Sequence, residues 1–327
     1  MTTIAITGIG GFIGRRLRDR LLDEGLTVRG LDIDDDAVAD AHDAGVDAVV
    51  GDVTDRAAVA ECVEGADVVV HTAAIVDESG DRDEFYRVNV EGTRRVVETS
   101  ADAGVERLIH LSSVMVHGFD YPQDVDETTD FPDVDNIYCE TKQVSERVAL
   151  DAHDPEAMDV VVLRPGDVYG AGSRPWVLRP LEMMKSGLFK LPGGGRGVIN
   201  HVYIDNLIDA LLLALDEDVG GEVFHITDGV ATECLQFFSH HCKMLGDGDV
   251  STAPTWLLKS FLTLAGPVCR LSGIESPGTP EAMDFLLRKN RISNAKARDQ
   301  LGFEPRIDLD EGFRRIEQKL RDDGLLE

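Results

Sequence analysis

The chain is poor in basic residues. Its 32 lysines and arginines stand against 61 aspartates and glutamates, which gives a formal net charge of -29. Such a surface repels the phosphates of nucleic acids and anionic membranes, so we expect no nucleic-acid partner. The acids are spread along the chain and form no single tail. This leads to the hypothesis that the protein works in a high-salt cytoplasm, where salt screens the self-repulsion; a merely acidic mesophilic protein is the alternative.

Cysteines and long apolar runs are also scarce. The five cysteines are far apart and show no CxxC spacing, which predicts reduced thiols and argues against a disulfide framework or a zinc site. They are Cys62, Cys139, Cys234, Cys242 and Cys269. The apolar stretch 255–271 is interrupted by Lys259, Pro267 and Arg270 and is too short to span a bilayer. Because no basic segment followed by an apolar region opens the chain, the sequence predicts a cytoplasmic protein with no integral membrane segment.

Short β-branched runs alternate with longer amphipathic segments in the first half of the chain. These runs include TIAIT, LTVRGLD, VDAVVGD, ADVVVHTAA, VERLIHLSS and MDVVVLRPG. Fully apolar strands between helices predict an α/β fold with a doubly wound parallel sheet, the Rossmann arrangement. We expect a nucleotide-binding domain over 1–165, to which 198–227 returns with the strand-like runs GVINHVYI and GEVFHITDG. Residues 166–197 and 228–327 would form a smaller, mostly helical substrate-binding lobe.

A glycine-rich turn follows the first predicted strand. The run GIGGFIG places Gly8, Gly11 and Gly14 three apart just as a helix begins. A backbone without Cβ atoms can approach a pyrophosphate there, and the helix N-terminus supplies unpaired N–H groups. Asp32 ends the second strand, where a carboxylate can accept both hydroxyls of an adenosine ribose and would repel a 2′-phosphate, so NAD is favoured over NADP. The alternative is an ordinary acid beside the acidic loop 34–36.

Tyr138 and Lys142 lie four positions apart in a predicted helix and would share one face. A lysine ammonium near a tyrosine favours the phenolate and lowers the phenol pKa towards the range useful for acid–base catalysis. Ser112 and Ser113 end the preceding strand, at the edge where open α/β sheets bind ligands. The alternative for the Tyr138 and Lys142 pair is an exposed helical pair without a chemical role.

These segments together resemble the extended short-chain dehydrogenase/reductases, the NAD-dependent epimerase/dehydratase family. The matching motifs are TGIGGFIG, GDVTD, HTAA, NVEGT, SSVMVHG, YCETK, LRPGDVYG and HVYIDNL, in the order and spacing of that family. The resemblance implies Tyr138 as catalytic acid/base, Lys142 as its pKa partner, and Ser113 rather than Ser112 as the group that hydrogen-bonds the reacting oxygen. Asn89 would support the local structure. The implied NAD-binding set is Gly8, Gly11, Phe12, Ile13, Gly14, Asp32, Asp52, Val53, Ala73, Ala74, Tyr138, Lys142, Pro165 and Val168.

The second half points to one branch of this family. Nucleotide-sugar members usually carry, after the sixth strand, an Asn that binds the substrate diphosphate, whereas this chain has Gly166 and Asp167. The runs LPGGGRGVINHVYIDNLIDALLLAL and RISNAKARDQLGFEPRIDLDEGF resemble the 3β-hydroxysteroid dehydrogenase and dihydroflavonol reductase-like branch. The resemblance implies an NAD-dependent oxidoreductase that interconverts a secondary alcohol and a ketone on a bulky apolar, steroid- or lipid-like molecule. The alternatives are a nucleotide-sugar epimerase or dehydratase with tightly bound NAD and a non-enzymatic NAD-sensing protein.

Further expectations concern partners and single residues. The family resemblance implies a homodimer through the helices 84–101 and 136–152. The helix at 255–266 could line the substrate channel, rest on a membrane surface or pack at an interface. His117 is a candidate substrate contact, and Arg174 could clamp an anionic substrate group or pair with a nearby acid. The run His240, His241 and Cys242 lacks a partner cluster at ligand spacing, so we expect no metal.

Overall fold

Residues 2–77, 80–246, 248–272 and 282–326 are described by a computed structural model, except for the side chains of 265–272. Seven strands form the central sheet: β1 (Thr3–Thr7), β2 (Thr27–Asp32), β3 (Asp47–Val50), β4 (Val68–His71), β5 (Arg107–Leu111), β6 (Asp159–Pro165) and β10 (Val223–Ile226). All pairs are parallel, in the order β10-β6-β5-β4-β1-β2-β3. The chain runs outward from β1 in one direction and returns to β4 on the other side, which confirms the predicted doubly wound α/β fold.

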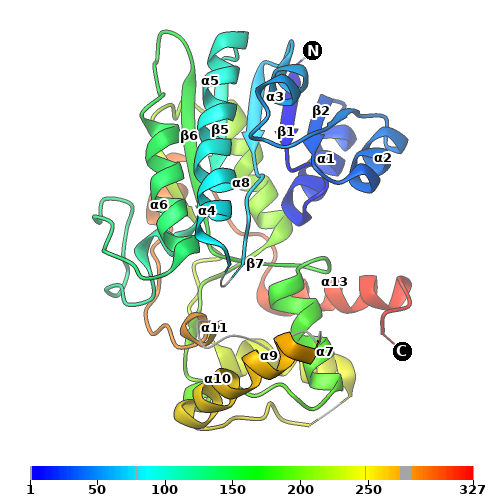
Figure 1. Cartoon of the computed structure of the whole chain (residues 1–327), viewed down its shortest axis with the longest axis vertical. Coiled ribbons are helices and arrows are strands. Elements are labelled where there is room, and N and C mark those ends of the chain that lie inside the picture. The colour runs from blue at the N-terminus through cyan, green and yellow to red at the C-terminus, as the bar shows by residue number, and fades with distance from the viewer. Residues whose placement is uncertain (1, 78–79, 247, 273–281, 327) are drawn as a thin grey trace.

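Helices cover both faces of this sheet (Figure 1). On one face lie α1 (Phe12–Asp23), α2 (Asp35–Asp43) and α8 (Ile204–Asp216), which share an apolar core with the strands. On the other lie α3 (Arg56–Val63), α5 (Thr93–Ala103) and α6 (Ile137–Leu150). A short helix α4 (Arg82–Phe85) continues through a π-helical stretch, Tyr86–Gly92, into α5. Because the central strands are buried on both faces, they read as continuous apolar runs, and this is why the sequence predicts them.

The predicted strand GVINHVYI is divided into two short strands that do not join the central sheet. β8 (Val198–Ile199) pairs with β11 (Thr232–Glu233), and β9 (His201–Tyr203) pairs with β7 (Asp167–Tyr169). Asn200 lies between β8 and β9. Its side-chain amide donates to Tyr121 Oη at 2.9 Å and accepts from the backbone N–H of Ile292 at 2.9 Å, and these bonds interrupt the strand. The later run was predicted correctly, since its β10 pairs with β6 at the sheet edge.

The second half also builds a helical region below the sheet in Figure 1. It contains α7 (Arg179–Lys185), α9 (Cys234–Leu245), α10 (Thr255–Ser272), α11 (Ala282–Phe285) and α13 (Leu309–Asp322), while α12 (Ala295–Gln300) contacts β10. Short 3-10 or π-helical segments occur at Val114–His117, Arg174–Leu178 and Pro192–Gly195. The division of the chain into two domains stays a prediction.

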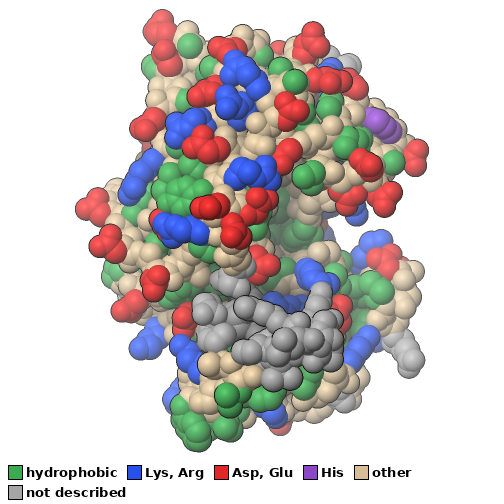
Figure 2. Space-filling view, in the orientation of Figure 1, with side chains coloured by type: hydrophobic (Ala, Val, Ile, Leu, Met, Phe, Trp, Pro, Cys, Tyr) green, Lys and Arg blue, Asp and Glu red, His purple; other side chains and the backbone are tan. Residues whose placement is uncertain are grey.

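The surface carries scattered acidic side chains and some exposed apolar ones. Figure 2 shows acidic side chains scattered over the whole face, with no single acidic patch. Apolar side chains of α10 are solvent-exposed, including Trp256 at 71% and Leu264 at 74%. Within the described ranges, no helix is both long enough and apolar enough to cross a bilayer.

Candidate active site

The candidate site is a cleft of about 1380 Å³ at the carboxyl edge of the sheet. This volume exceeds the roughly 300–1,000 Å³ of a typical small-molecule pocket, so it can hold a cofactor and a second molecule together. The structure brings every residue that the sequence analysis assigned to catalysis or NAD binding to the wall of this one cleft. Their individual roles stay predictions.

The glycine turn fits a bound pyrophosphate. Gly8 has a left-handed φ of 74°, and a Cβ on Gly14 would lie 2.1 Å from the carbonyl oxygen of Gly8. The N-cap of α1 is Gly11, which offers no side-chain hydrogen bond to the first helical turn. By contrast, an Asp or Asn side chain caps each of α2, α3 and α6. The N–H groups at the start of α1 therefore have no side-chain cap and line the cleft, as an anion site requires.

Asp32 is held in place by the same turn. Its Oδ2 atom accepts a hydrogen bond from the backbone N–H of Gly10 at 2.8 Å, and its Oδ1 atom accepts one from the backbone N–H of Asp34 at 3.2 Å. Asp34, Asp36 and Asp40 line this end of the cleft as well. The like charge of these carboxylates would disfavour a phosphate group at this end of the cleft.

The opposite rim of this end is formed after β3. Asp52 accepts from the backbone N–H and hydroxyl of Thr54, and it pairs with Arg87 at 2.8 Å. The Arg87 guanidinium lowers the pKa of this carboxyl, although burial opposes the shift. Val53 is buried and lines the cleft beside Asp52. An apolar side chain next to a fixed carboxylate suits the flat face and polar edge of an adenine.

Tyr138 lies in the first turn of α6 and Ser113 lies just beyond the end of β5. Burial raises the pKa of the Tyr138 phenol to about 12, and a hydrogen bond with the Ser113 hydroxyl lowers it by a smaller amount. Ser113 Oγ also accepts from the backbone N–H of Met115 at 3.1 Å, which fixes its side chain. The structure therefore places the serine against the tyrosine, as the resemblance implies.

Lys142 is buried one turn after Tyr138. Its Nζ atom donates to the carbonyl oxygen of Leu111 at 2.9 Å. Burial lowers the pKa of Lys142 to about 8, while the charge of Glu146 raises it. Burial is the largest influence on the Tyr138 pKa, and the lowering by Lys142 that the spacing predicts stays a prediction. The ammonium is held by the end of β5.

Ser112, the less favoured serine, is bonded to Glu146. Its Oγ atom donates to Glu146 Oε2 at 2.5 Å. Asn89 has the local role expected of it, because its side chain accepts from the backbone N–H of Ile75 at 2.7 Å and donates to Thr141 Oγ1 at 3.2 Å. The sequence analysis missed Glu146, although its position four residues after Lys142 on one helix was a usable signal.

Asp167 is buried and forms an ion pair with Arg288 at 2.6 Å. The guanidinium of Arg288 also donates to the carbonyl oxygen of Phe285 at 2.9 Å. Burial raises the pKa of Asp167, while Arg288 lowers it. Asp167 stands where nucleotide-sugar members carry an Asn, which drew attention to it in the sequence, whereas no local pattern could connect it with Arg288 so far along the chain. The pair ties the segment that follows α11 to the start of β7.

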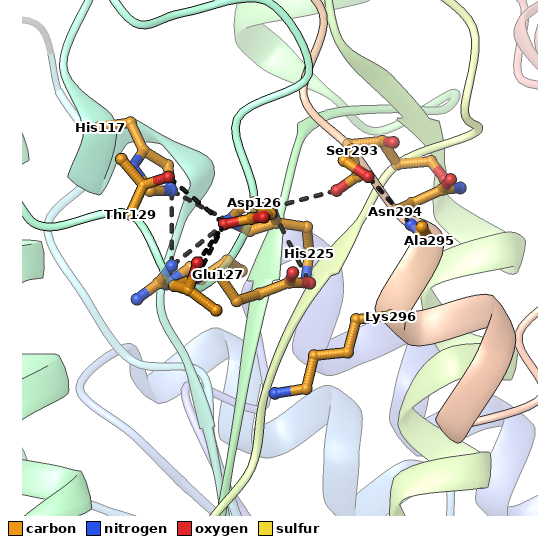
Figure 3. Close-up of polar contacts among 12 residues, drawn as sticks. His117, Asp126, Glu127, Thr129, His225, Ser293, Asn294, Ala295 and Lys296 are labelled. Carbon is orange, nitrogen blue, oxygen red and sulfur yellow. Dashed lines mark hydrogen bonds and ion pairs between the residues drawn. The ribbon is translucent and has the colours of Figure 1, made fainter.

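His117 does not line the cleft, so the structure does not support its expected contact with substrate. Its ring is buried, and Nε2 lies 3.0 Å from Nε2 of His225. Figure 3 shows the two rings near Asp126 and Glu127. Burial lowers the pKa of His117 to about 4. Among the described residues, no group of three or more His, Cys, Asp or Glu side chains could hold a metal ion.

The lining that comes from the second half of the chain is largely apolar. It includes Trp176, Met183, Leu188, Phe189, Phe238, Leu258, Phe261, Leu262, Met283, Phe285 and Leu286. Arg174, Arg179 and Lys190 add positive charge. These residues come from α7, α9, α10, α11 and the segments between them, which explains why the sequence could not assemble the wall. Four cysteines are free and buried, whereas Cys269 lies outside the described side chains.

Comparison with known proteins gives the same class. A 4-hydroxy-2-methyl-3-oxo-4-farnesyl-3,4-dihydroquinoline-1-oxide ketoreductase from Stigmatella aurantiaca is 28% identical, over 96% of this chain and 95% of its own length. A 3-beta-hydroxysteroid dehydrogenase from Mycolicibacterium neoaurum is 30% identical, over 92% of this chain and 87% of its own. The structure of MoeE5 in complex with UDP-glucuronic acid and NAD is similar with a TM-score of 0.77 and 25% identity, covering 98% of this chain and all of MoeE5.

The fold, the cleft and these relatives define an enzyme of the extended short-chain dehydrogenase/reductase class. The sequence model of the 3-beta hydroxysteroid dehydrogenase/isomerase family matches residues 5–255. The chain therefore belongs to that family, and the resemblance seen in its motifs is confirmed.

Proposed function

We propose that this enzyme uses NAD to interconvert a secondary alcohol and a ketone on a bulky apolar, steroid- or lipid-like substrate. The observation that carries the proposal is that Tyr138 and Ser113 line the same cleft as the glycine turn and a largely apolar set of side chains from the second half of the chain. A relative named a 3-beta-hydroxysteroid dehydrogenase and another named a ketoreductase of a farnesylated dihydroquinoline oxide both support a bulky, largely apolar substrate.

NAD would be held by the glycine turn and Asp32. The uncapped N-terminus of α1 would bind the pyrophosphate, and the carboxylate of Asp32 would accept the ribose hydroxyls. When bound, the nicotinamide exchanges a hydride with the substrate carbon. The NAD in the similar MoeE5 structure supports this cofactor.

Ser113, Tyr138 and Lys142 would act on the substrate oxygen. Ser113 would hydrogen-bond this oxygen, and Tyr138 Oη would donate a proton to it in ketone reduction or remove one in alcohol oxidation. Because burial raises the pKa of Tyr138 to about 12, the phenol is protonated at neutral pH and is ready for reduction. Alcohol oxidation needs the phenolate, which a nearby Lys142 ammonium stabilises. We therefore expect reduction to be favoured at neutral pH and oxidation to speed up as the pH rises to about 8, above which Lys142 loses its proton.

The Asp167–Arg288 pair bears on the alternative substrate. A nucleotide sugar would bring a diphosphate to this region, where the buried Arg288 is already bonded to Asp167 and where Gly166 and Asp167 stand in place of the Asn that follows the sixth strand in nucleotide-sugar members. The nucleotide-sugar epimerase or dehydratase nevertheless stays the second candidate, because MoeE5 binds UDP-glucuronic acid on a similar fold.

One experiment separates the two candidates. The protein is purified in high salt without added nucleotide and denatured, and the NAD released per chain is quantified. The purified protein is then tested with NADH and apolar ketones, and with UDP-glucose and UDP-glucuronic acid. Little retained NAD together with ketone-dependent NADH oxidation would support the proposal. Near-stoichiometric NAD with turnover of a UDP-sugar would contradict it.

The assembly and the cellular setting belong to the same proposal. We propose a homodimer that pairs through the outer surfaces of α5 and α6, in a high-salt cytoplasm. Size-exclusion chromatography with light scattering, in molar KCl, tests the dimer directly.

A further inference from the structure

Glu146 lies on α6, one turn beyond Lys142 and two turns beyond Tyr138. Residues spaced by four share one face of a helix, so the three side chains form one row. The Glu146 side chain is only 1% exposed. A carboxylate is rarely buried so completely without partners, and such a site needs a physical explanation.

The partners of Glu146 come from two neighbouring strands. Ser112, just beyond β5, donates its hydroxyl to Oε2 at 2.5 Å. Arg164 in β6 donates from Nη2 to Oε1 at 2.6 Å and from Nε to Oε2 at 3.0 Å. Each partner is next in sequence to a residue that lines the cleft, Ser113 or Pro165. The carboxylate thus joins α6 to the two strand ends that carry the reacting side of the cleft.

Glu146 also acts on the charge of Lys142. The other titratable groups that face Lys142 are His71 from β4, His110 from β5 and Tyr138 from α6 itself. Burial lowers the pKa of His71 to about 3 and that of His110 well below its usual value, and Lys142 adds to both shifts. These imidazoles are therefore neutral above pH 6, so they neither repel the Lys142 ammonium nor supply a negative charge that would stabilise it. Among the described residues, Glu146 is the group whose charge raises the pKa of Lys142.

We infer that Glu146 is a positioning residue of this site: it holds the Ser112–Ser113 end of β5 against α6, and its negative charge keeps Lys142 protonated. The catalytic part of this inference rests on the proposed function, whereas the effect on Lys142 does not. An ammonium at Lys142 is needed to stabilise a Tyr138 phenolate, and burial alone would favour the neutral amine. The buried negative charge of Glu146 opposes this loss of the Lys142 proton.

The first test measures the charge on Lys142 without substrate or cofactor. The protein is labelled with ¹³C at the lysine ε-carbon, the Lys142 resonance is assigned by its loss in Lys142→Arg, and its pKa is read from an NMR titration. Glu146→Gln keeps an oxygen for the Ser112 hydroxyl but removes the charge. We expect the pKa of Lys142 to fall by about one unit or more in this variant. Glu140→Gln, on the same helix and paired with Arg82 and Tyr86, is the matched control and should leave it unchanged.

A second variant guards against misfolding. Glu146→Gln leaves the buried guanidinium of Arg164 unpaired, which can prevent folding. The double variant Glu146→Gln with Arg164→Met removes that charge too, and we expect the same fall in the pKa of Lys142. Glu146→Asp keeps the negative charge and should leave the Lys142 pKa close to that of the unmodified protein. An unchanged Lys142 pKa in the double variant would overturn the inference.

The second test uses the pH dependence of catalysis. In Glu146→Gln we expect the pH at which alcohol oxidation reaches half its maximum kcat to fall by about one unit, because Lys142 loses its proton at a lower pH, and we expect the maximum kcat to fall too, with KM for the apolar substrate little changed. A merely structural role would lower kcat at every pH without moving the profile, and that result would overturn the catalytic part. If the unmodified enzyme reduces no apolar ketone, the proposed function fails, while the NMR titration still decides the role of Glu146.

Discussion

Replacing Lys142 by methionine is expected to stabilise the fold while abolishing catalysis. The side chain is 5% exposed, and burial lowers the pKa of its ammonium from 10.5 to about 8. Between these values the unfolded chain binds a proton that the folded chain releases, so the stability rises with pH across this window. Below pH 8 the folded protein bears the full cost of the buried charge.

The size of the effect follows from the pKa shift. At pH 7 the shift corresponds to about 3 kcal/mol of lost stability. Methionine removes this cost but also the hydrogen bond from Nζ to the Leu111 carbonyl oxygen, which contributes about 1 kcal/mol. The net gain is about 2 kcal/mol, which for a chain of this length raises Tm by roughly 3 °C.

The assay is thermal unfolding followed by circular dichroism at pH 7 and pH 9.5 in high salt. At pH 9.5 Lys142 is neutral in the folded protein and the gain should shrink to less than about 1 °C. Lys243→Met, at an exposed position of α9, is the control and should leave Tm within about 1 °C at both pH values. A fall in Tm for Lys142→Met at pH 7, or an equal gain at both pH values, would refute the reasoning.

Three further predictions follow from other parts of the structure. Asp32→Ala should weaken NAD binding about 10- to 100-fold and reduce the preference for NAD over NADP, both measured by calorimetry. An unchanged affinity for NAD would rule out a contact between Asp32 and the ribose. Arg288→Met should cost about 3–5 kcal/mol in urea unfolding because Asp167 stays buried and unpaired, and adding Asp167→Asn should recover most of that loss; equal stability of the two variants would contradict the role of the ion pair. Tm should rise between dilute buffer and molar KCl, because salt screens the net charge of -29; no rise would count against a high-salt setting.

Local spacing explains what could be predicted from the sequence. Gly8, Gly14 and Asp32 mark two strand ends and one turn, and Tyr138 and Lys142 share one helix face. These signals depend only on neighbours in the chain, and the structure gathers all of them in one cleft. The parallel sheet was equally predictable, since its strands are apolar on both faces.

Long-range pairing explains what could not be predicted. Asp167 is neutralised by Arg288, which is 121 residues away in the chain. Glu146 shares a helix with Lys142, but its partner Arg164 comes from a neighbouring strand. Asn200 divides the run GVINHVYI through hydrogen bonds to distant segments. The periodicity of the run gives no sign of these bonds, so the sequence predicted a single strand.

The most direct test of the central claim is a comparison of the unmodified enzyme with Tyr138→Phe. Both proteins are incubated in high salt with NADH and a panel of apolar ketones that includes 3-ketosteroids, and NADH oxidation is followed by absorbance. NADH binding is measured in parallel by fluorescence. We expect ketone-dependent oxidation by the unmodified enzyme and a loss of at least about 100-fold in kcat for Tyr138→Phe, with NADH affinity unchanged. Near-full turnover by Tyr138→Phe with intact NADH binding would contradict the account.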